Sequence, residues 1–178
     1  MARPSARSRI VEAALTAGAA VGESVTLEVV ARSAGVTKQG ILYHFPERRD
    51  LRSAMLEHVL ARWEQEMHRV LGGPLEAAAV PDRIRAYARV SAHGDVVPGE
   101  GVLFAEILAR PDELPPYEAW VQRWFAPGAH DDPARRARLL TAWLAANGLW
   151  SVLVTGKRRL ARAEVAAVLA VVDDLTAV

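Results

Sequence analysis

Residues 26–46, TLEVVARSAGVTKQGILYHFP, decide the fold of the N-terminal part of the chain. Thr26 is suited to cap a short helix with its hydroxyl, and Gly35 is suited to end that helix in the left-handed conformation. Thr37 is suited to cap a second short helix. This helix must end before Pro46, because proline disfavours helical geometry in the residue before it. Two short helices joined by a glycine-containing turn predict a helix-turn-helix unit.

The second of these helices carries the side chains that point to DNA. Its first residues supply a hydroxyl, a cation and an amide, which can reach phosphate oxygens or base edges in the major groove. Gly40 costs about 1 kcal/mol of helix stability relative to alanine, and a close approach to DNA would explain it. A phenol and an imidazole follow at the helix end, and arginines begin the next helix. The predicted DNA contacts are Thr26, Thr37, Lys38, Gln39, Gly40, Tyr43, His44 and Arg48.

The composition is that of an ordinary globular protein. The chain has 178 residues, of which 51% are hydrophobic and 24% charged, so apolar side chains suffice for a core. Residues 1–52 carry eight basic and five acidic side chains (+3), whereas the remainder carries 14 and 16 (−2). A basic N-terminal part is a weak indication of nucleic-acid binding, and a solvated charged surface explains it equally well.

Glycine and proline clusters divide the chain into helix-sized segments. Within them, apolar residues recur at helical spacing, as at Ile10, Ala14, Ala17 and Val21. No alternating run of β-branched or aromatic residues bounded by hairpin turns interrupts this pattern. We therefore predict an all-α protein of about nine helices.

The first 50 or so residues resemble the DNA-binding domain of the TetR (tetracycline-repressor-like) family of bacterial regulators. The matching residues are Thr26, Ala31, the Ala34-Gly35-Val36-Thr37 turn, Tyr43-His44-Phe45 and Leu51. The family usually has a tyrosine where this chain has Leu42. The resemblance implies a helix-turn-helix domain over residues 1–52, with a ligand-binding and dimerisation domain over residues 53–178. The expected parts of the latter are a connecting helix, a variable body and two C-terminal helices, at residues 48–71, 82–125, 133–155 and 161–177.

The aromatic residues of this expected body invite a ligand-pocket interpretation, because pockets for small molecules are mostly apolar with a few polar anchors. The predicted ligand-binding residues are Phe104, Trp120, Trp124, Tyr87, Trp63 and Asn147. The alternative is that these side chains form an ordinary core.

Residues 133–155 form a helix that is apolar nearly all round and therefore has to be covered on two faces. A second subunit is the simplest cover for the face that its own domain leaves open. The predicted dimer interface consists of Trp143, Trp150, Val165, Leu169 and Val172. The alternative is a bundle within one chain.

The sequence offers little for enzymatic chemistry. It has no cysteine, no histidine pair at metal-ligand spacing and no glycine-rich phosphate loop. We therefore expect no catalytic residue, no metal and no cofactor. The most apolar stretch, residues 139–154, is shorter than the ~20 residues of a membrane span, so a cytoplasmic location is expected.

These observations lead to one expected function and three alternatives. The resemblance implies a ligand-responsive repressor that acts as a homodimer on a palindromic DNA operator and binds a small apolar or amphipathic ligand. The first alternative is an activator or co-repressed regulator of the same fold, which would couple ligand and DNA with the opposite sign. The second is a sequence-tolerant architectural DNA-binding dimer, and the third is an all-α enzyme.

Overall fold

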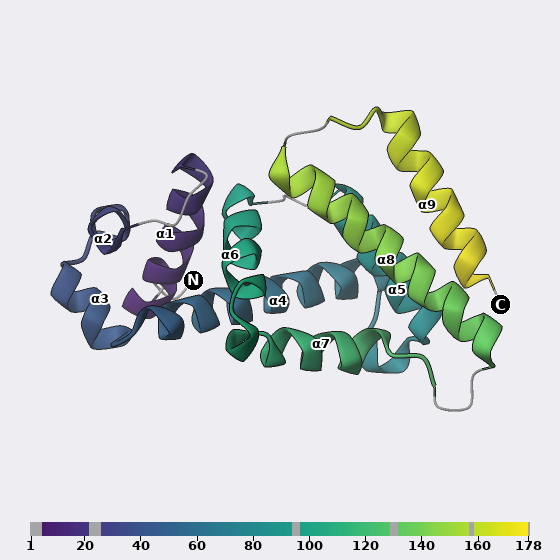
Figure 1. The fold of residues 1–178 in the computed structure, drawn as a ribbon, viewed down its shortest axis with the longest axis horizontal. Coiled ribbons are helices and arrows are strands. Elements are labelled where there is room, and N and C mark those ends of the chain that lie inside the picture. Colours follow the sequence, from purple (N-terminus) through teal and green to yellow (C-terminus); the bar gives the residue numbers. More distant parts are fainter. Residues whose placement is uncertain (1–4, 22–25, 94–96, 129–131, 157–158, 178) are drawn as a thin grey trace. The chain divides into compact units, whose positions relative to one another are not determined.

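The computed structural model describes residues 5–21, 26–93, 97–128, 132–156 and 159–177 (Figure 1). These residues form nine α-helices and two short 3-10 helices, without a strand among them, which confirms the predicted all-α fold. Their contacts divide the chain into two compact units. Unit 1 comprises Met1–Leu60 and Val97–Pro116, and unit 2 comprises Ala61–Val96 and Tyr117–Val178.

Unit 1 contains the predicted helix-turn-helix. Its elements are α1 (Ala6–Val21), α2 (Leu27–Ala34), α3 (Lys38–His44), the first half of α4 (Arg48–Leu71), α6 (Pro98–Leu108) and the 3-10 helix η2 (Pro111–Glu113). The three predicted helix boundaries are confirmed. Thr26 and Thr37 accept hydrogen bonds from the N–H groups of Val29 and Gly40, and Gly35 ends α2 at φ 66°.

The core of the helix-turn-helix is built from small and branched apolar side chains. Ile41 of α3 is fully buried, and Val30 and Ala31 of α2 are nearly so. Ile10 of α1 is also fully buried. Since α3 has only seven residues, it depends on such packing rather than on its own helix propensity.

Helix α6 packs on α1 with its backbone in direct contact. A Cβ atom at Gly99 would lie only 1.8 Å from the carbonyl oxygen of Leu15, so this crossing tolerates no side chain. The contact draws residues 97–116 into unit 1, and α4 remains in unit 1 as far as Leu60. The two compact units therefore meet at Leu60 and at both ends of residues 97–116, whereas the predicted domain boundary lies between residues 52 and 53. The reason is a contact distant in sequence.

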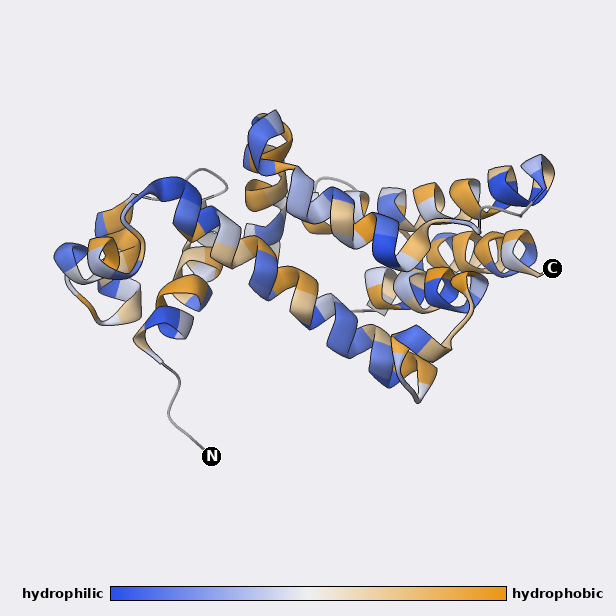
Figure 2. Ribbon diagram, turned by 90° about the horizontal axis from the view of Figure 1, so that it is seen from below, coloured by the Kyte–Doolittle hydropathy of each residue, from blue (hydrophilic) through white to orange (hydrophobic). Residues whose placement is uncertain are grey.

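Unit 2 contains the second half of α4, the 3-10 helix η1 (Leu75–Ala77), α5 (Val80–His93), most of α7 (Pro115–Phe125), α8 (Pro133–Thr155) and α9 (Arg162–Thr176). Helices α5, α8 and α9 pack on one another pairwise. Most helices carry hydrophobic and hydrophilic residues on different sides (Figure 2). Among the described residues, α8 alone is long and apolar enough to span a membrane, a test that core helices also pass.

Candidate nucleic-acid interface

Two threonines cap the helices of the helix-turn-helix, and their hydroxyl protons remain available for a hydrogen bond to a phosphate. The Oγ1 atom of Thr37 accepts from the Gly40 N–H at 3.0 Å, and that of Thr26 accepts from the Val29 N–H at 3.4 Å. Each hydroxyl uses an oxygen lone pair in its cap, so its proton is still available for donation. Because both residues are exposed, each can cap its helix and also donate to a phosphate oxygen.

The exposed side of α3 combines an amide with a phenol. Gln39 and Tyr43 are one helical turn apart, and the tyrosine side chain is 83% exposed. The ring of half-buried His44 meets that of Tyr43 edge to face, with centroids 5.2 Å apart. A large aromatic side chain in open solvent gains nothing for folding. Its position instead suits contact with another molecule.

Lys38 is held by an acidic residue that was not among the predicted site residues. Its Nζ lies 2.5 Å from Oε1 of Glu28 in α2, and both side chains are more than half exposed. This hydrogen bond and the lysine charge lower the pKa of the Glu28 carboxyl. A phosphate would therefore compete with Glu28 for Lys38. The detectable signal was a pair of opposite charges at the starts of two adjoining helices.

Gly40 has an explanation within the fold. A Cβ atom at this position would lie 3.3 Å from the capping Oγ1 of Thr37 and 3.7 Å from the Cβ of Val36. The first distance is tighter than an ordinary contact, so a larger residue would press on the cap. The contact with the Thr37 cap therefore explains the glycine here without any contact to DNA.

The three arginines at the start of α4 differ in what they can do. Exposed Arg48 makes no hydrogen bond or ion pair within the described part of the chain. Arg49 pairs with Glu47 at 3.0 Å. Arg52 donates from Nε and Nη2 to the Glu113 carboxylate, which lowers the pKa of Glu113. Arg48 is therefore the one of the three whose guanidinium is left for a phosphate.

The predicted ligand-binding residues divide between the two units. Phe104 is buried in unit 1, whereas Trp63, Tyr87, Trp120, Trp124 and Asn147 belong to unit 2. In unit 2, the Trp63 ring lies 5.7 Å, centroid to centroid, from both Tyr87 and Trp120. The Tyr87 hydroxyl donates to Oδ1 of Asn147 at 3.1 Å. The structure thus brings together the predicted residues of unit 2 as a packed cluster.

Glu64 completes this aromatic cluster and was not predicted from the sequence. Its Oε1 accepts hydrogen bonds from the indole N–H groups of Trp120 at 2.8 Å and Trp124 at 2.7 Å. Nearby, burial raises the pKa of Tyr117 to about 12, and its hydroxyl donates to Asn147 at 3.4 Å. Nothing in the residue pattern distinguishes Glu64 from the other acids of α4, so only the fold could identify it.

One of the five predicted dimer residues is buried inside unit 2, and the other four are half-buried. Val172 is 1% exposed, so its side chain packs inside its own chain and cannot meet a partner directly. Trp143, Trp150, Val165 and Leu169 are half-buried. The large apolar side chains that unit 2 exposes most on α8 and α9 are instead Leu140, Leu144 and Val171, at 53–54%.

A family model described as "Tetracyclin repressor-like, C-terminal domain" matches residues 81–177, which is more than half of the chain. A comparison with curated proteins finds no match. Solved structures share the fold over 97% of this chain. They include a TetR-family regulator from Rhodococcus sp. (19% identity, 99% of its chain, TM-score 0.68). Another is the multidrug binding protein EbrR complexed with imidazole (24% identity, 96% of its chain, TM-score 0.60). LfrR from Mycobacterium smegmatis in complex with proflavine is a further example (20%, 95%, 0.55).

Proposed function

Because the chain belongs to the tetracyclin repressor-like family of transcriptional regulators, we propose that it is a ligand-responsive repressor that binds a palindromic operator as a homodimer. One observation carries the proposal. The capped helix α3 presents exposed Gln39 and Tyr43, with Lys38 and Arg48 close in sequence. The amide is suited to a base edge, and the cations and hydroxyls are suited to phosphates.

The dimer is proposed from the surface of unit 2. Leu140 and Leu144 lie one turn apart on α8 and Val171 lies on α9, all more than half exposed. A second copy of this face would bury these side chains against their own equivalents, as a two-fold interface requires. Recognition helices commonly act in such symmetric pairs, and their spacing then sets the spacing of the two half-sites.

The ligand is proposed to act by linkage between two sites. The ligand can release DNA only to the extent that it binds the state that cannot bind DNA more tightly than the state that can. The coupling free energy between two such sites is typically about 1–3 kcal/mol. EbrR and LfrR, which share the fold, were solved with imidazole and proflavine. The cluster around Trp63, Trp120 and Trp124, with Glu64 and Asn147 as polar groups, supports a ligand with an aromatic ring. We assign the protein no enzymatic activity and place it in the cytoplasm, where its operator would be.

Selection of bound DNA from a random pool, with and without an extract of small molecules from the source cells, tests the proposal. A palindromic consensus that is lost on adding extract is the expected result. A consensus that appears or strengthens with extract would identify a co-repressed regulator or activator. Binding without any consensus would identify a sequence-tolerant architectural protein and overturn the proposal.

A further inference from the structure

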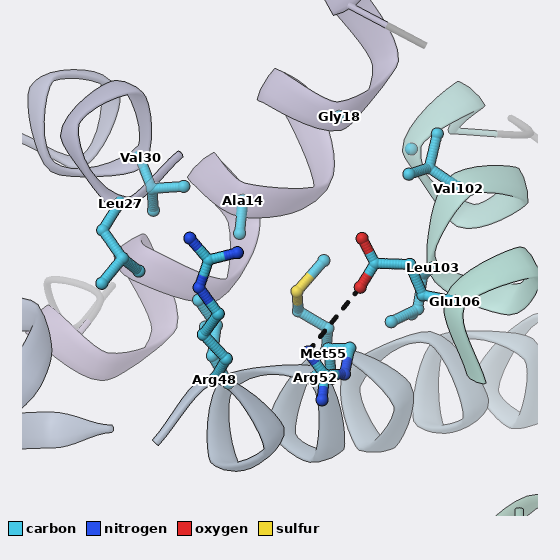
Figure 3. A pocket seen from close by; sticks show the side chains of 12 residues that line it. Ala14, Gly18, Leu27, Val30, Arg48, Arg52, Met55, Val102, Leu103 and Glu106 are labelled. Atoms are coloured by element: carbon cyan, nitrogen blue, oxygen red, sulfur yellow. Dashed lines mark ion pairs between the residues drawn. The ribbon is translucent and has the colours of Figure 1, made fainter. Parts of the chain in front are cut away.

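Unit 1 contains a cavity of about 60 Å³ between α1, α2, α4 and α6 (Figure 3). We propose that this cavity binds a small aliphatic monocarboxylate, with the carboxylate on Arg48 and the alkyl chain between the helices. The residues that the argument uses are Ala14, Arg48, Arg52, Met55, Leu103 and Glu106. The cavity is separate from the aromatic cluster of unit 2, because all its lining residues belong to unit 1.

The interior of the cavity suits a short alkyl chain. Ala14 of α1 and Leu103 of α6 are buried, and the thioether of half-buried Met55 lies between these helices (Figure 3). A volume of 60 Å³ is less than half of the roughly 150 Å³ of an apolar cavity that binds benzene. A chain of a few carbons therefore fills it, while an aromatic drug does not.

The charged side chains favour an anion at one side of the cavity. Arg48 extends from α4 beside Ala14, and it has no partner within the described part of the chain (Figure 3). Its guanidinium can therefore donate two parallel hydrogen bonds to a carboxylate. Arg52 also lines the cavity, but its charge is compensated by Glu113 and Glu106, so the anion is held by Arg48.

Glu106 sets the orientation and the number of charges of the ligand. Its carboxylate projects from α6 toward α4, and its ion pair with Arg52 is long, at 3.8 Å between Oε2 and Nη1 (Figure 3). This negative charge repels a carboxylate on the α6 side and leaves the Arg48 side as the place for the head group. It also disfavours a second carboxylate at the other end of the chain, so a monocarboxylate is preferred over a dicarboxylate.

The contact between α1 and α6 fixes the size of the cavity. Gly99 lines it, and at this residue the α6 backbone meets the Leu15 carbonyl group with no room for a side chain. Two backbones already in contact cannot move closer, and packed helices resist small expansions. The affinity should therefore rise with chain length only until the cavity is full.

Occupation of the cavity would weaken DNA binding, a step that rests on the proposed function. Arg48 is one of the predicted phosphate contacts, and its guanidinium cannot hold a carboxylate and a phosphate in the same geometry. The ligand should reduce affinity for any DNA sequence and flatten the salt dependence by about one contact for each subunit. By reciprocity, DNA should weaken carboxylate binding by the same factor.

Calorimetric titration of the full chain without DNA tests the site directly. The probes are straight-chain monocarboxylates of two to eight carbons, with the primary amide and the amine of each length. We expect the carboxylates to bind, with an optimum at intermediate length, and the amides to bind at least about tenfold more weakly. Arg48→Gln should weaken carboxylate binding at least about tenfold, whereas Arg32→Gln, which removes an exposed arginine outside the cavity, should change it less than about twofold.

A second variant separates the cavity from other sites. Met55→Ala enlarges the cavity and should move the optimum to a longer chain. Equal binding of carboxylate and amide, or an unchanged affinity in Arg48→Gln, would overturn the proposal. Preferential binding of amines, lost in Glu106→Gln, would show a cation site in its place. The titration contains no DNA, so it tests the cavity independently of the proposed function. If carboxylates bind but the DNA selection finds no operator, the proposed repressor is contradicted and the carboxylate site is not.

Discussion

Gly99→Ala is the substitution whose effect can be worked out most directly, because its new atom meets backbone. The added Cβ would lie 1.8 Å from the Leu15 carbonyl oxygen and 2.7 Å from the carbonyl carbon. A carbon–oxygen contact is ordinarily no shorter than roughly 3.3 Å, so α1 and α6 must separate locally by roughly 1.5 Å. Overpacking costs about 1–3 kcal/mol, and alanine in a helix gains at most about 1 kcal/mol over glycine. A backbone group cannot rotate away, so the overpacking cost should lie at the upper end of its range, and we expect a net loss of about 2 kcal/mol.

Urea unfolding followed by far-ultraviolet circular dichroism measures this loss. Ala105→Gly, at an exposed position of the same helix, is the control for helix propensity and should lose about 0.5–1 kcal/mol. All five tryptophans belong to unit 2, so their fluorescence follows that unit while circular dichroism follows both. A Gly99→Ala protein that is as stable as the parent, or more stable by the propensity gain, would refute the close backbone crossing.

Three further predictions concern the other surfaces. Lys38→Ala should weaken binding to all DNA sequences and lower the slope of log affinity against log salt concentration by about 1, whereas Gln39→Ala should reduce the preference for one base at one position by about 1–3 kcal/mol. Unchanged base preferences of Gln39→Ala in competition binding would exclude a base contact by Gln39. Leu144→Glu should give monomers in sedimentation with unit 2 still folded, whereas Val172→Glu should unfold unit 2, because Val172 is buried in its own chain. If Leu144→Glu remains a stable dimer, the face that carries Leu144 is not the interface. Glu113→Gln should destabilise the protein at neutral pH, and the difference should shrink as the pH falls towards the lowered pKa of Glu113, since a carboxyl of depressed pKa stabilises only while ionised. A difference that stays constant as the pH is lowered in urea titrations would contradict the Arg52–Glu113 pair.

The helix-turn-helix was predictable because its determinants are local. Thr26, Gly35 and Thr37 act within a few residues of their own positions, and each occurs in the structure where the sequence placed it. Most helix boundaries followed in the same way from glycine and proline. Local signals therefore defined the elements and the predicted recognition helix.

Contacts between distant residues were not predictable. Gly99 belongs to one of the glycine and proline clusters that the sequence analysis placed between helices, yet it lies within α6, and its missing side chain lets α6 pack against α1. Glu64 looked like any acid on a long helix, yet it accepts hydrogen bonds from two indoles. In α9, both sides are apolar, so periodicity alone could not tell that Val172 faces inward while Val171 remains exposed. In each case the burial or the hydrogen bond depends on residues that are distant in the sequence and adjacent only in the folded chain.

Packing within unit 2 accounts for the buried residues of α8, among them Leu139, Ala142 and Leu149. The apolar residues that α8 leaves exposed have two candidate explanations, a membrane and a second copy of the chain. Its exposed Leu140 and Leu144 are accompanied by exposed Thr141, Gly148 and Ser151. A lipid-facing surface would need a continuous apolar face about 20 residues long, whereas this one is short and interrupted by polar and small residues. Small residues let two helices approach closely, and leucines between them supply the apolar area to bury. The pattern therefore favours a helix–helix interface, the geometry that would hold two copies of α3 at a fixed spacing on DNA.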